Sequence, residues 1–170
     1  MSEEKRSGCP INLTLEALGD RWSLIVIRDL MFGDRRYFRE LLANSDEGIS
    51  SSVLANRLKR LVSAGLITRK QEPTHKQKTL YSLAEPAIQA LPMLVQMGAW
   101  GVRHTPANYA LGIRAKVLVD GGPELWTRLM EELRVYHVRT PMRASPPKPG
   151  SARAEVERNI DRVMKRPKRS

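Results

Sequence analysis

The sequence predicts a mainly α-helical fold with one small β-hairpin, arranged as a winged helix-turn-helix domain followed by a helical C-terminal extension. Three observations carry this prediction. Two short helical patterns flank a polar turn between residues 36 and 64. Two β-type runs then bracket a charged loop, and a further apolar helical pattern begins at residue 85. This order is that of the two helices of a helix-turn-helix followed by a basic hairpin, or wing.

Two helices are expected ahead of this region. Asn12 is suited to cap a helix over the leucines that follow it. Asp20 is suited to cap a second helix, which runs from Trp22 through Leu30. Because this second helix is almost continuously apolar, we expect it in the middle of the core.

The helix-turn-helix itself is expected over residues 37–64. Turn-forming residues from Asn44 to Gly48 end its first helix. Ser50 is a good N-cap for the second, because its hydroxyl can accept a hydrogen bond from a free backbone N–H, and Gly65 ends that helix. Leucines at helical spacing give the second helix one apolar side. Its hydrophilic residues fall on the opposite side, which would face a major groove: Ser52, Asn56, Lys59 and Arg60.

The β-type runs 66–70 and 79–83 bracket the polar loop 71–78, which predicts a hairpin with a charged tip. A helix is then expected from Glu85-Pro86 to Arg103. Pro92 lies inside this pattern, where it either kinks the helix or marks the start of its longer half. A helix this apolar needs a covering surface, which a second copy of the chain would provide.

Residues 105–138 form a charge-neutral block expected to be a helical extension. Residues 111–119 fit either a helix or a strand, and 123–138 fit a helix after the break at Gly121-Gly122. This block would close a ligand pocket or enlarge a dimer contact, and we favour the contact. Prolines make 139–150 a linker, and a marginal helix is expected over 152–164 before the basic end. The expected divisions are a flexible terminus 1–8, a winged-helix and dimerisation domain 9–104, the extension 105–138, and a linker with a basic tail 139–170.

The charge of the chain points to a polyanionic partner or an anionic membrane surface. Its 170 residues include 29 Lys and Arg against 18 Asp and Glu, for a formal net charge of +11. Residues 139–170 hold 10 basic and 3 acidic side chains, so most of the excess lies at that end. No apolar run approaches the roughly 18 residues that cross a bilayer, and the first residues lack the apolar core of a signal peptide. We therefore expect a cytoplasmic protein without membrane contact.

The residues that bind metals or catalyse reactions do not occur at the spacings that such sites require. Cys9 is the only cysteine, and the three histidines lie far apart, so neither a metal site nor a cofactor is expected. There is no phosphate-binding glycine loop and no nucleophile placed beside a base. We expect a protein that is not an enzyme.

Double-stranded DNA is the partner that the pattern favours. Short polar side chains near the start of a groove-binding helix read base edges, and basic residues on a hairpin hold flanking phosphates or enter the minor groove. A single basic residue would more often be a solvated one, but their ordered succession favours groove binding. The predicted DNA-binding residues are Arg36, Ser50, Ser51, Ser52, Asn56, Arg57, Lys59, Arg60, Arg69, Lys70, His75, Lys76 and Lys78.

The same region carries a family resemblance over about residues 9–104. Its motifs are Cys9-Pro10, then 18–30 (LGDRWSLIVIRDL), 36–41 (RYFREL), 48–50 (GIS), 54–61 (LANRLKRL), 65–69 (GLITR) and 81–83 (YSL). They resemble the HxlR family of bacterial winged-helix transcriptional regulators. The resemblance implies a homodimer whose two recognition helices, at about 51–64, meet a pseudo-palindromic operator. It also implies an interface formed by the N-terminal segment and the helix that carries Leu91, Leu94, Val95 and Trp100.

Cys9 matches the N-terminal cysteine that some members of this family use to sense electrophiles or oxidants. A reactive thiol has to ionise, because the thiolate is the nucleophile. The alternative, which we favour, is a small residue packed at the dimer interface. A small-molecule or electrophile effector is accordingly a further expected partner.

The expected function is that of a dimeric, sequence-specific transcriptional regulator, and we expect a repressor. The alternative is a non-specific architectural or protein-interaction module with the same fold. Preference for the protein's own upstream region over bulk DNA separates the two.

Overall fold

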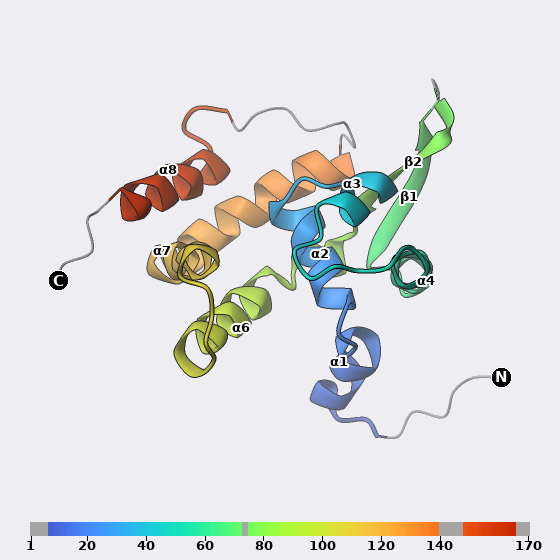
Figure 1. Ribbon diagram of the computed structural model, residues 1–170, viewed down its shortest axis with the longest axis horizontal. Coiled ribbons are helices and arrows are strands. Elements are labelled where there is room, and N and C mark those ends of the chain that lie inside the picture. The colour runs from blue at the N-terminus through green and yellow to red at the C-terminus, as the bar shows by residue number, and fades with distance from the viewer. Residues whose placement is uncertain (1–6, 73–74, 140–147, 166–170) are drawn as a thin grey trace. The chain divides into compact units, whose positions relative to one another are not determined.

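The computed structural model describes residues 7–72, 75–139 and 148–165, with their side chains except those of residues 75–77. The chain forms two compact units, Met1–Ala84 and Glu85–Ser170, and each is described by itself (Figure 1). None of the helices in the described ranges is long and apolar enough to cross a membrane.

The first unit begins with α1 (Pro10–Leu18) and α2 (Ser23–Phe32). The N-cap of α1 is Cys9, so this helix starts earlier than expected, because Pro10 fits a first turn that needs no N–H. The N-cap of α2 is Trp22, two residues after the predicted cap Asp20, which nevertheless binds the start of the helix. The carboxylate of Asp20 accepts hydrogen bonds from the backbone N–H groups of Trp22 at 2.8 Å and Ser23 at 3.0 Å.

The helix-turn-helix consists of α3 (Phe38–Ala43) and α4 (Ser51–Ser63). Ser50 caps α4, since its hydroxyl accepts a hydrogen bond from the N–H of Val53 at 3.4 Å. Gly65 comes after the helix with a φ of 69°, a left-handed conformation that glycine adopts without strain. Both sequence signals therefore fix the ends of this helix as predicted.

The hairpin pairs β1 (Ile67–Glu72) with β2 (His75–Leu83), antiparallel and in a register that places Ile67 opposite Leu83. The strands are longer than expected, because most residues of the predicted loop 71–78 belong to them. Polar residues pair through their backbone as well as apolar ones do, so the polar sequence did not mark a loop. Tyr37 adds an isolated bridge to Leu80, which joins the start of α3 to the hairpin.

The second unit begins with a short helix, α5 (Glu85–Ile88), followed by α6 (Leu91–His104). Pro92 lies in the first turn of α6, so it marks the start of the longer half of the helix. Next comes α7 (Tyr109–Arg134), whose N-cap Asn108 accepts hydrogen bonds from the N–H groups of the first turn. Residues 111–119 are therefore helical.

The helices α6 and α7 pack closely at two glycines. A Cβ on Gly98 would lie 3.0 Å from the Cβ of Ala115. A Cβ on Gly112 would lie 3.1 Å from a methyl carbon of Val102. Both distances are shorter than ordinary carbon contacts, so glycine at these positions allows the two backbones to approach.

This packing corrects two of the predicted dimer residues. Leu91 and Val95 are buried within the chain, with 0% and 2% exposure, and α6 packs on α7. Leu94 is half-buried, and Trp100 keeps 57% exposure. The helix predicted to belong to the domain 9–104 thus lies in the same compact unit as the extension.

A sharp bend divides α7 at Gly122, whose φ of 61° and ψ of −169° are not helical. Pro123 comes directly after it and begins the second half of the helix. The indole N–H of Trp126 donates to the carbonyl oxygen of Leu118 at 2.6 Å, which satisfies a carbonyl that the bend leaves open. A short π-helix, η1 (Val135–Arg139), continues the chain.

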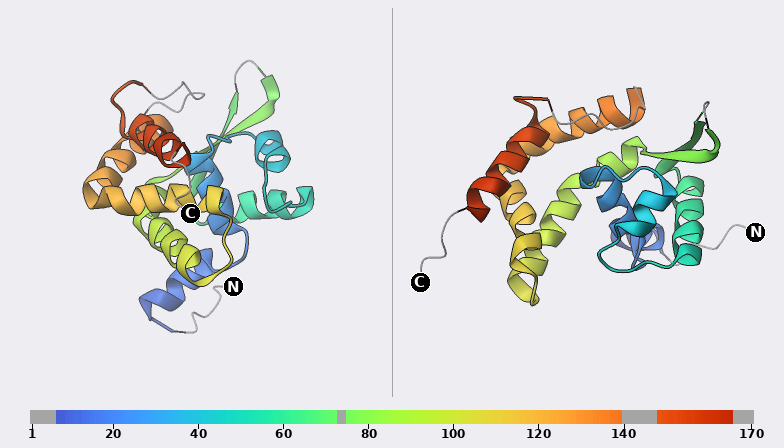
Figure 2. Two further views of the ribbon diagram at one scale, coloured as in Figure 1. Left: turned by 60° about the vertical axis from the view of Figure 1, so that its left-hand side comes forward. Right: turned by 45° about the horizontal axis from the view of Figure 1, so that its top comes forward.

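The last helix, α8 (Ala152–Met164), has the bounds expected from the sequence, but it is not merely part of a linker and tail. It packs on α7, as Figure 2 shows from two sides. Glu132 of α7 accepts hydrogen bonds from the backbone N–H groups of Ala152 and Arg153, and Ala152 and Val156 are buried. The flexible terminus predicted for 1–8, the proline-rich linker and the basic end fall largely on residues outside the described ranges.

Candidate nucleic-acid interface

The two sides of α4 differ sharply in exposure. Leu54, Leu58 and Leu61 are 0%, 2% and 1% exposed, and they hold the helix on the core. The opposite side is exposed and carries short polar side chains and two cations: Ser51, Ser52, Asn56, Lys59 and Arg60. The first unit therefore leaves this face of the helix open to a partner.

Arg57 is the exception among the predicted residues of α4. Its guanidinium forms an ion pair with the carboxylate of Asp20 at 2.8 Å, and only 13% of its side chain is exposed. The structure thus places Arg57 in an ion pair inside the unit and not on the exposed face of α4, and its predicted contact with the DNA backbone stays a prediction. This pair links α4 to the start of α2.

The electrostatics of Asp20 agree with that role. Burial raises the pKa of its carboxyl group. Hydrogen bonds from Ser23 and Trp22, with the charge of Arg57, outweigh burial and hold the pKa below its usual value. Asp20 therefore stays ionised while it binds the start of one helix and orients another.

Arg36 is buried, which corrects its predicted contact with DNA. It keeps only 2% exposure, and its guanidinium donates to the carbonyl oxygen of Tyr81 at 3.1 Å and to the hydroxyl of Ser82. In return, the carbonyl of Arg36 accepts a hydrogen bond from the N–H of Tyr81 at 2.9 Å. Arg36 thus fastens the segment before α3 to the second strand of the hairpin.

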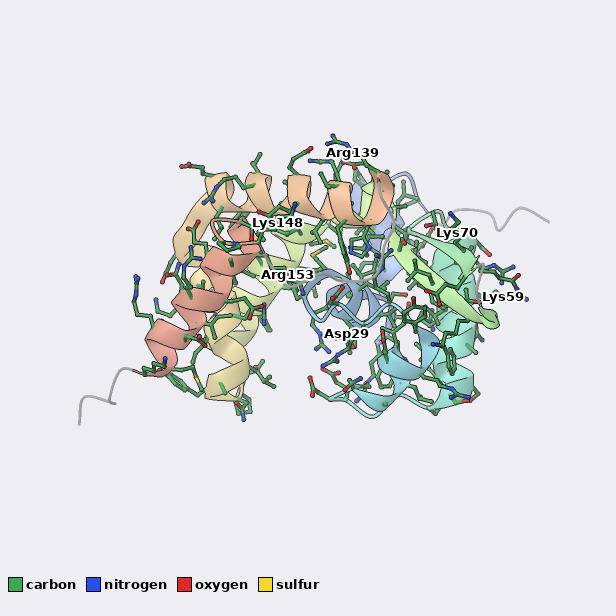
Figure 3. All side chains as sticks on the ribbon, turned by 90° about the horizontal axis from the view of Figure 1, so that it is seen from above. Asp29, Lys59, Lys70, Arg139, Lys148 and Arg153 are labelled. Carbon is green, nitrogen blue, oxygen red and sulfur yellow. The ribbon has the colours of Figure 1, made fainter. Side chains whose placement is uncertain are left out.

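The remaining described cations of the hairpin are open to solvent, as contact with a DNA backbone would require. Arg69, Lys70 and Lys78 are exposed. In Figure 3 the side chains of Lys59 on α4 and Lys70 on β1 both point away from the body of the first unit. His75 and Lys76 belong to β2, but their side chains lie outside the described part of the structure.

A second ion-pair group braces the turn before α4. Arg28 of α2 pairs with Glu47 at 2.6 Å and with Asp29 at 2.8 Å, and Arg35 pairs with the same aspartate at 3.2 Å. The hydrogen bond from Arg28 lowers the pKa of Glu47 and more than offsets burial, which raises it. This group ties the turn between α3 and α4 to the core helix.

The sequence did not predict either of these two ion-pair groups. Asp20 and Arg57 are 37 residues apart, and Arg28 and Glu47 are 19 apart. No periodicity links such positions, so only a fold that brings them together identifies the pairs.

Cys9 lies in the first unit, away from α4 in sequence. Its thiol is free and exposed, and the residue is the N-cap of α1. The next apolar side chains of that helix are also exposed, with Ile11 at 73% and Leu15 at 60%.

An open polar helix, preceded by a helix and turn and followed by a cationic hairpin, defines the winged helix-turn-helix class of DNA-binding domains. The chain belongs to the HxlR-like helix-turn-helix family, whose model matches residues 17–109. Relatives of this chain are named as transcriptional regulators.

Two relatives illustrate this membership. A helix-turn-helix transcriptional regulator of Mycobacterium bovis, itself uncharacterised, is 32% identical over 99 residues, which are 58% of this chain and 61% of that protein. The chain therefore spans less than two thirds of that relative's length. A similarly named regulator of Halalkalibacterium halodurans is 33% identical over 95 residues, which cover 56% of this chain and 83% of that protein.

Solved structures support the same fold. PA1607, a candidate transcription factor, superposes with a TM-score of 0.55 and 28% identity over 62% of this chain and 71% of its own. The redox regulator HypR in its oxidised form superposes with a TM-score of 0.50 and 25% identity, over 58% of this chain and 100% of its own.

Proposed function

We propose that this protein is a sequence-specific DNA-binding transcriptional regulator that inserts α4 into the major groove of its operator. The observation that carries the proposal is the division of α4 into a buried leucine side and an exposed polar side. A rod of this kind fits the major groove, and its polar side chains meet base edges there.

The exposed residues divide into two roles. Asn56 has an amide that can pair with both the acceptor and the donor of adenine, and Ser51 and Ser52 have hydroxyls that suit either kind of base partner. Lys59 and Arg60 on α4, with Arg69, Lys70 and Lys78 on the hairpin, neutralise phosphates and set the position of the helix. Asp20 and Arg57 act behind this surface as positioning residues.

The test compares one residue of each role. Asn56→Ala is expected to relax base preference at one position of the site, a loss of about 1–3 kcal/mol of discrimination. Lys70→Ala is expected to weaken all sequences alike and to reduce the dependence of affinity on salt by about one unit of slope. Affinities for selected and scrambled duplexes, measured across a salt series, check both. If both variants weakened every duplex equally, the assignment of α4 as the reading helix would be wrong.

We further propose that the regulator binds as a homodimer to a pseudo-palindromic operator and represses by occupying it. The exposed apolar side chains of α6 support a second copy as partner. Met97 and Trp100 lie one helical turn apart and keep 49% and 57% exposure. Ile11 and Leu15 on α1 provide a second exposed apolar surface. A twofold dimer would present two copies of α4 to half-sites about one turn of DNA apart.

Exposure of Cys9 favours a sensing role over the packed role that we expected from the sequence. A redox regulator is among the structures to which this chain is similar. We propose that an oxidant or electrophile modifies this thiol and thereby alters operator binding.

A non-specific architectural module is the competing function. Such a module would bind all duplexes with similar affinity, whereas a regulator prefers its own site by orders of magnitude at physiological salt. Binding to the protein's own upstream region, measured against an excess of bulk DNA, decides between them.

A further inference from the structure

The C-terminal helix α8 carries a row of cations on its outer side. Arg158, Arg162 and Lys165 are all exposed and succeed one another at one-turn spacing. The apolar residues Val156, Ile160 and Val163 lie on the other side of the helix, and Val156 is 3% exposed. We call these three cations the α8 stripe.

The helix that bears the stripe is held in place on α7. Glu132 accepts hydrogen bonds from two backbone N–H groups at the start of α8, one of them from Arg153 at 3.1 Å. Arg128 of α7 pairs with Glu155 of α8 at 2.9 Å. The hydroxyl of Ser151 caps α8 by accepting a hydrogen bond from the N–H of Ala154. The outward direction of the stripe within the second unit is therefore a result of packing.

Within the described ranges, the acidic residues of α8 form no ion pair with the stripe. Glu155 forms an ion pair with Arg128. Burial lowers the pKa of Arg114, and the negative charge of Glu157 partly offsets this effect. Asp161 is exposed beside the stripe, but within the described ranges it forms no ion pair with Arg158, Arg162 or Lys165.

Like charges one turn apart repel each other, and a bound anion would relieve that repulsion. Three further cations come next in the sequence, Arg166, Lys168 and Arg169. A polyanion with regularly spaced charges matches a linear row of cations better than a small ion does.

We propose that the α8 stripe binds the phosphate backbone of DNA and forms a second, sequence-independent contact in addition to α4 and the hairpin. The inference rests on the DNA binding proposed above. It assigns to α8, which lies beyond the matched region 17–109, a share of the affinity and none of the base preference.

The experiment uses the full chain and a long duplex of mixed sequence as the probe. The triple variant R158Q/R162Q/K165Q is compared with the matched variant K116Q/R139Q/K148Q, which removes three exposed cations of the same unit that do not belong to the stripe. Lys116 and Arg139 already pair with Asp120 and Glu131, so replacing them should weaken binding little. Thermal melting shows whether each variant keeps its fold.

The stripe variant is expected to reduce the slope of log affinity against log salt by about 2 to 3, since each phosphate that is no longer neutralised reduces it by about 0.9. Its ratio of affinities for selected and scrambled duplexes should stay unchanged. A salt slope equal to that of the matched variant would overturn the proposal. The stripe would then face either an acidic protein or solvent alone.

A different result would contradict the proposed function. If the native chain showed no preference for any selected duplex, sequence-specific regulation would be wrong. The slope on the mixed-sequence duplex would still decide whether the stripe contacts phosphates.

Discussion

Asn56 and Arg57 are neighbours in α4, yet their side chains have opposite surroundings. Asn56 is exposed, whereas Arg57 is paired with Asp20 and mostly covered. Arg36 and Arg39 show the same contrast near α3, since Arg36 is buried and Arg39 is exposed. An arginine serves either as a phosphate contact or as a brace, and the partner brought close by the fold decides which.

Arg36→Ala is expected to destabilise the first unit by about 2–4 kcal/mol, because it removes charged hydrogen bonds and leaves their partners on β2 buried. The free energy of unfolding in urea measures this loss. Arg39→Ala, at an exposed position, is the matched control and should change stability by less than about 0.5 kcal/mol. Equal effects of the two substitutions would contradict the bracing role of Arg36.

Cys9 offers a second prediction at the scale of one residue. Treatment with a thiol oxidant is expected to change operator affinity in the native chain and to leave Cys9→Ser unaffected, because Cys9 is the only thiol. Affinity before and after oxidation, and again after reduction, measures the effect. A response that persists in Cys9→Ser would exclude this thiol as the sensor.

At the scale of elements, two ion-pair groups set the position of α4. Asp20 holds Arg57 of α4 itself, and Arg28 of α2 holds the turn that precedes α4 through Glu47. Both carboxyl groups have a lowered pKa. The placement of α4 should therefore depend on pH.

A lowered pKa gives Glu47 a stabilising contribution at pH values above its unfolded value of 4.5. That contribution disappears as the pH falls below this value and through the folded pKa. Glu47→Gln is expected to lower the free energy of unfolding at neutral pH. It should also reduce the further loss of stability as the pH falls. Urea unfolding midpoints from neutral pH to about pH 3 test this, with the exposed neighbour Asp46→Asn as control. Parallel curves for the native chain and Glu47→Gln would refute it.

Local signals predicted the elements well, and contacts between elements poorly. Ser50, Gly65 and the leucine spacing fix α4 because caps, stops and periodicity act within one helix. The docking of α8 depends on Glu132, which lies 20 residues from the N–H of Ala152, so its sequence alone indicated only a marginal helix. The pairs of Arg57 and Arg36 were missed for the same reason.

At the scale of the whole molecule, α6 has one face that its own chain covers and another that stays open. The apolar pattern of α6 indicated a covered helix but not which residues its own chain covers. The structure assigns Leu91 and Val95 to internal packing and leaves Met97 and Trp100 exposed. A dimer formed through α6 therefore has to use the second pair.

Trp100→Glu is expected to convert the proposed dimer to a monomer, because burying an unpaired charge in an apolar contact is strongly unfavourable. Sedimentation measures the assembly, and affinity for a two-site duplex should fall while affinity for a half-site stays the same. Gln96→Glu introduces the same charge at another exposed position of α6 and should leave the assembly intact. A Trp100→Glu protein that sedimented like the native chain would place the interface elsewhere.

The glycine contacts between α6 and α7 also bear on which subunits can assemble with each other. HypR is matched over 100% of its length by 58% of this chain, so the rest of this chain has no counterpart in HypR. A shorter regulator that lacked α7 would present its α6 without the neighbour that Gly98 and Gly112 admit here. Mixed pairs of the two kinds of subunit would join surfaces of unequal shape, which would insulate this regulator from exchange with shorter relatives.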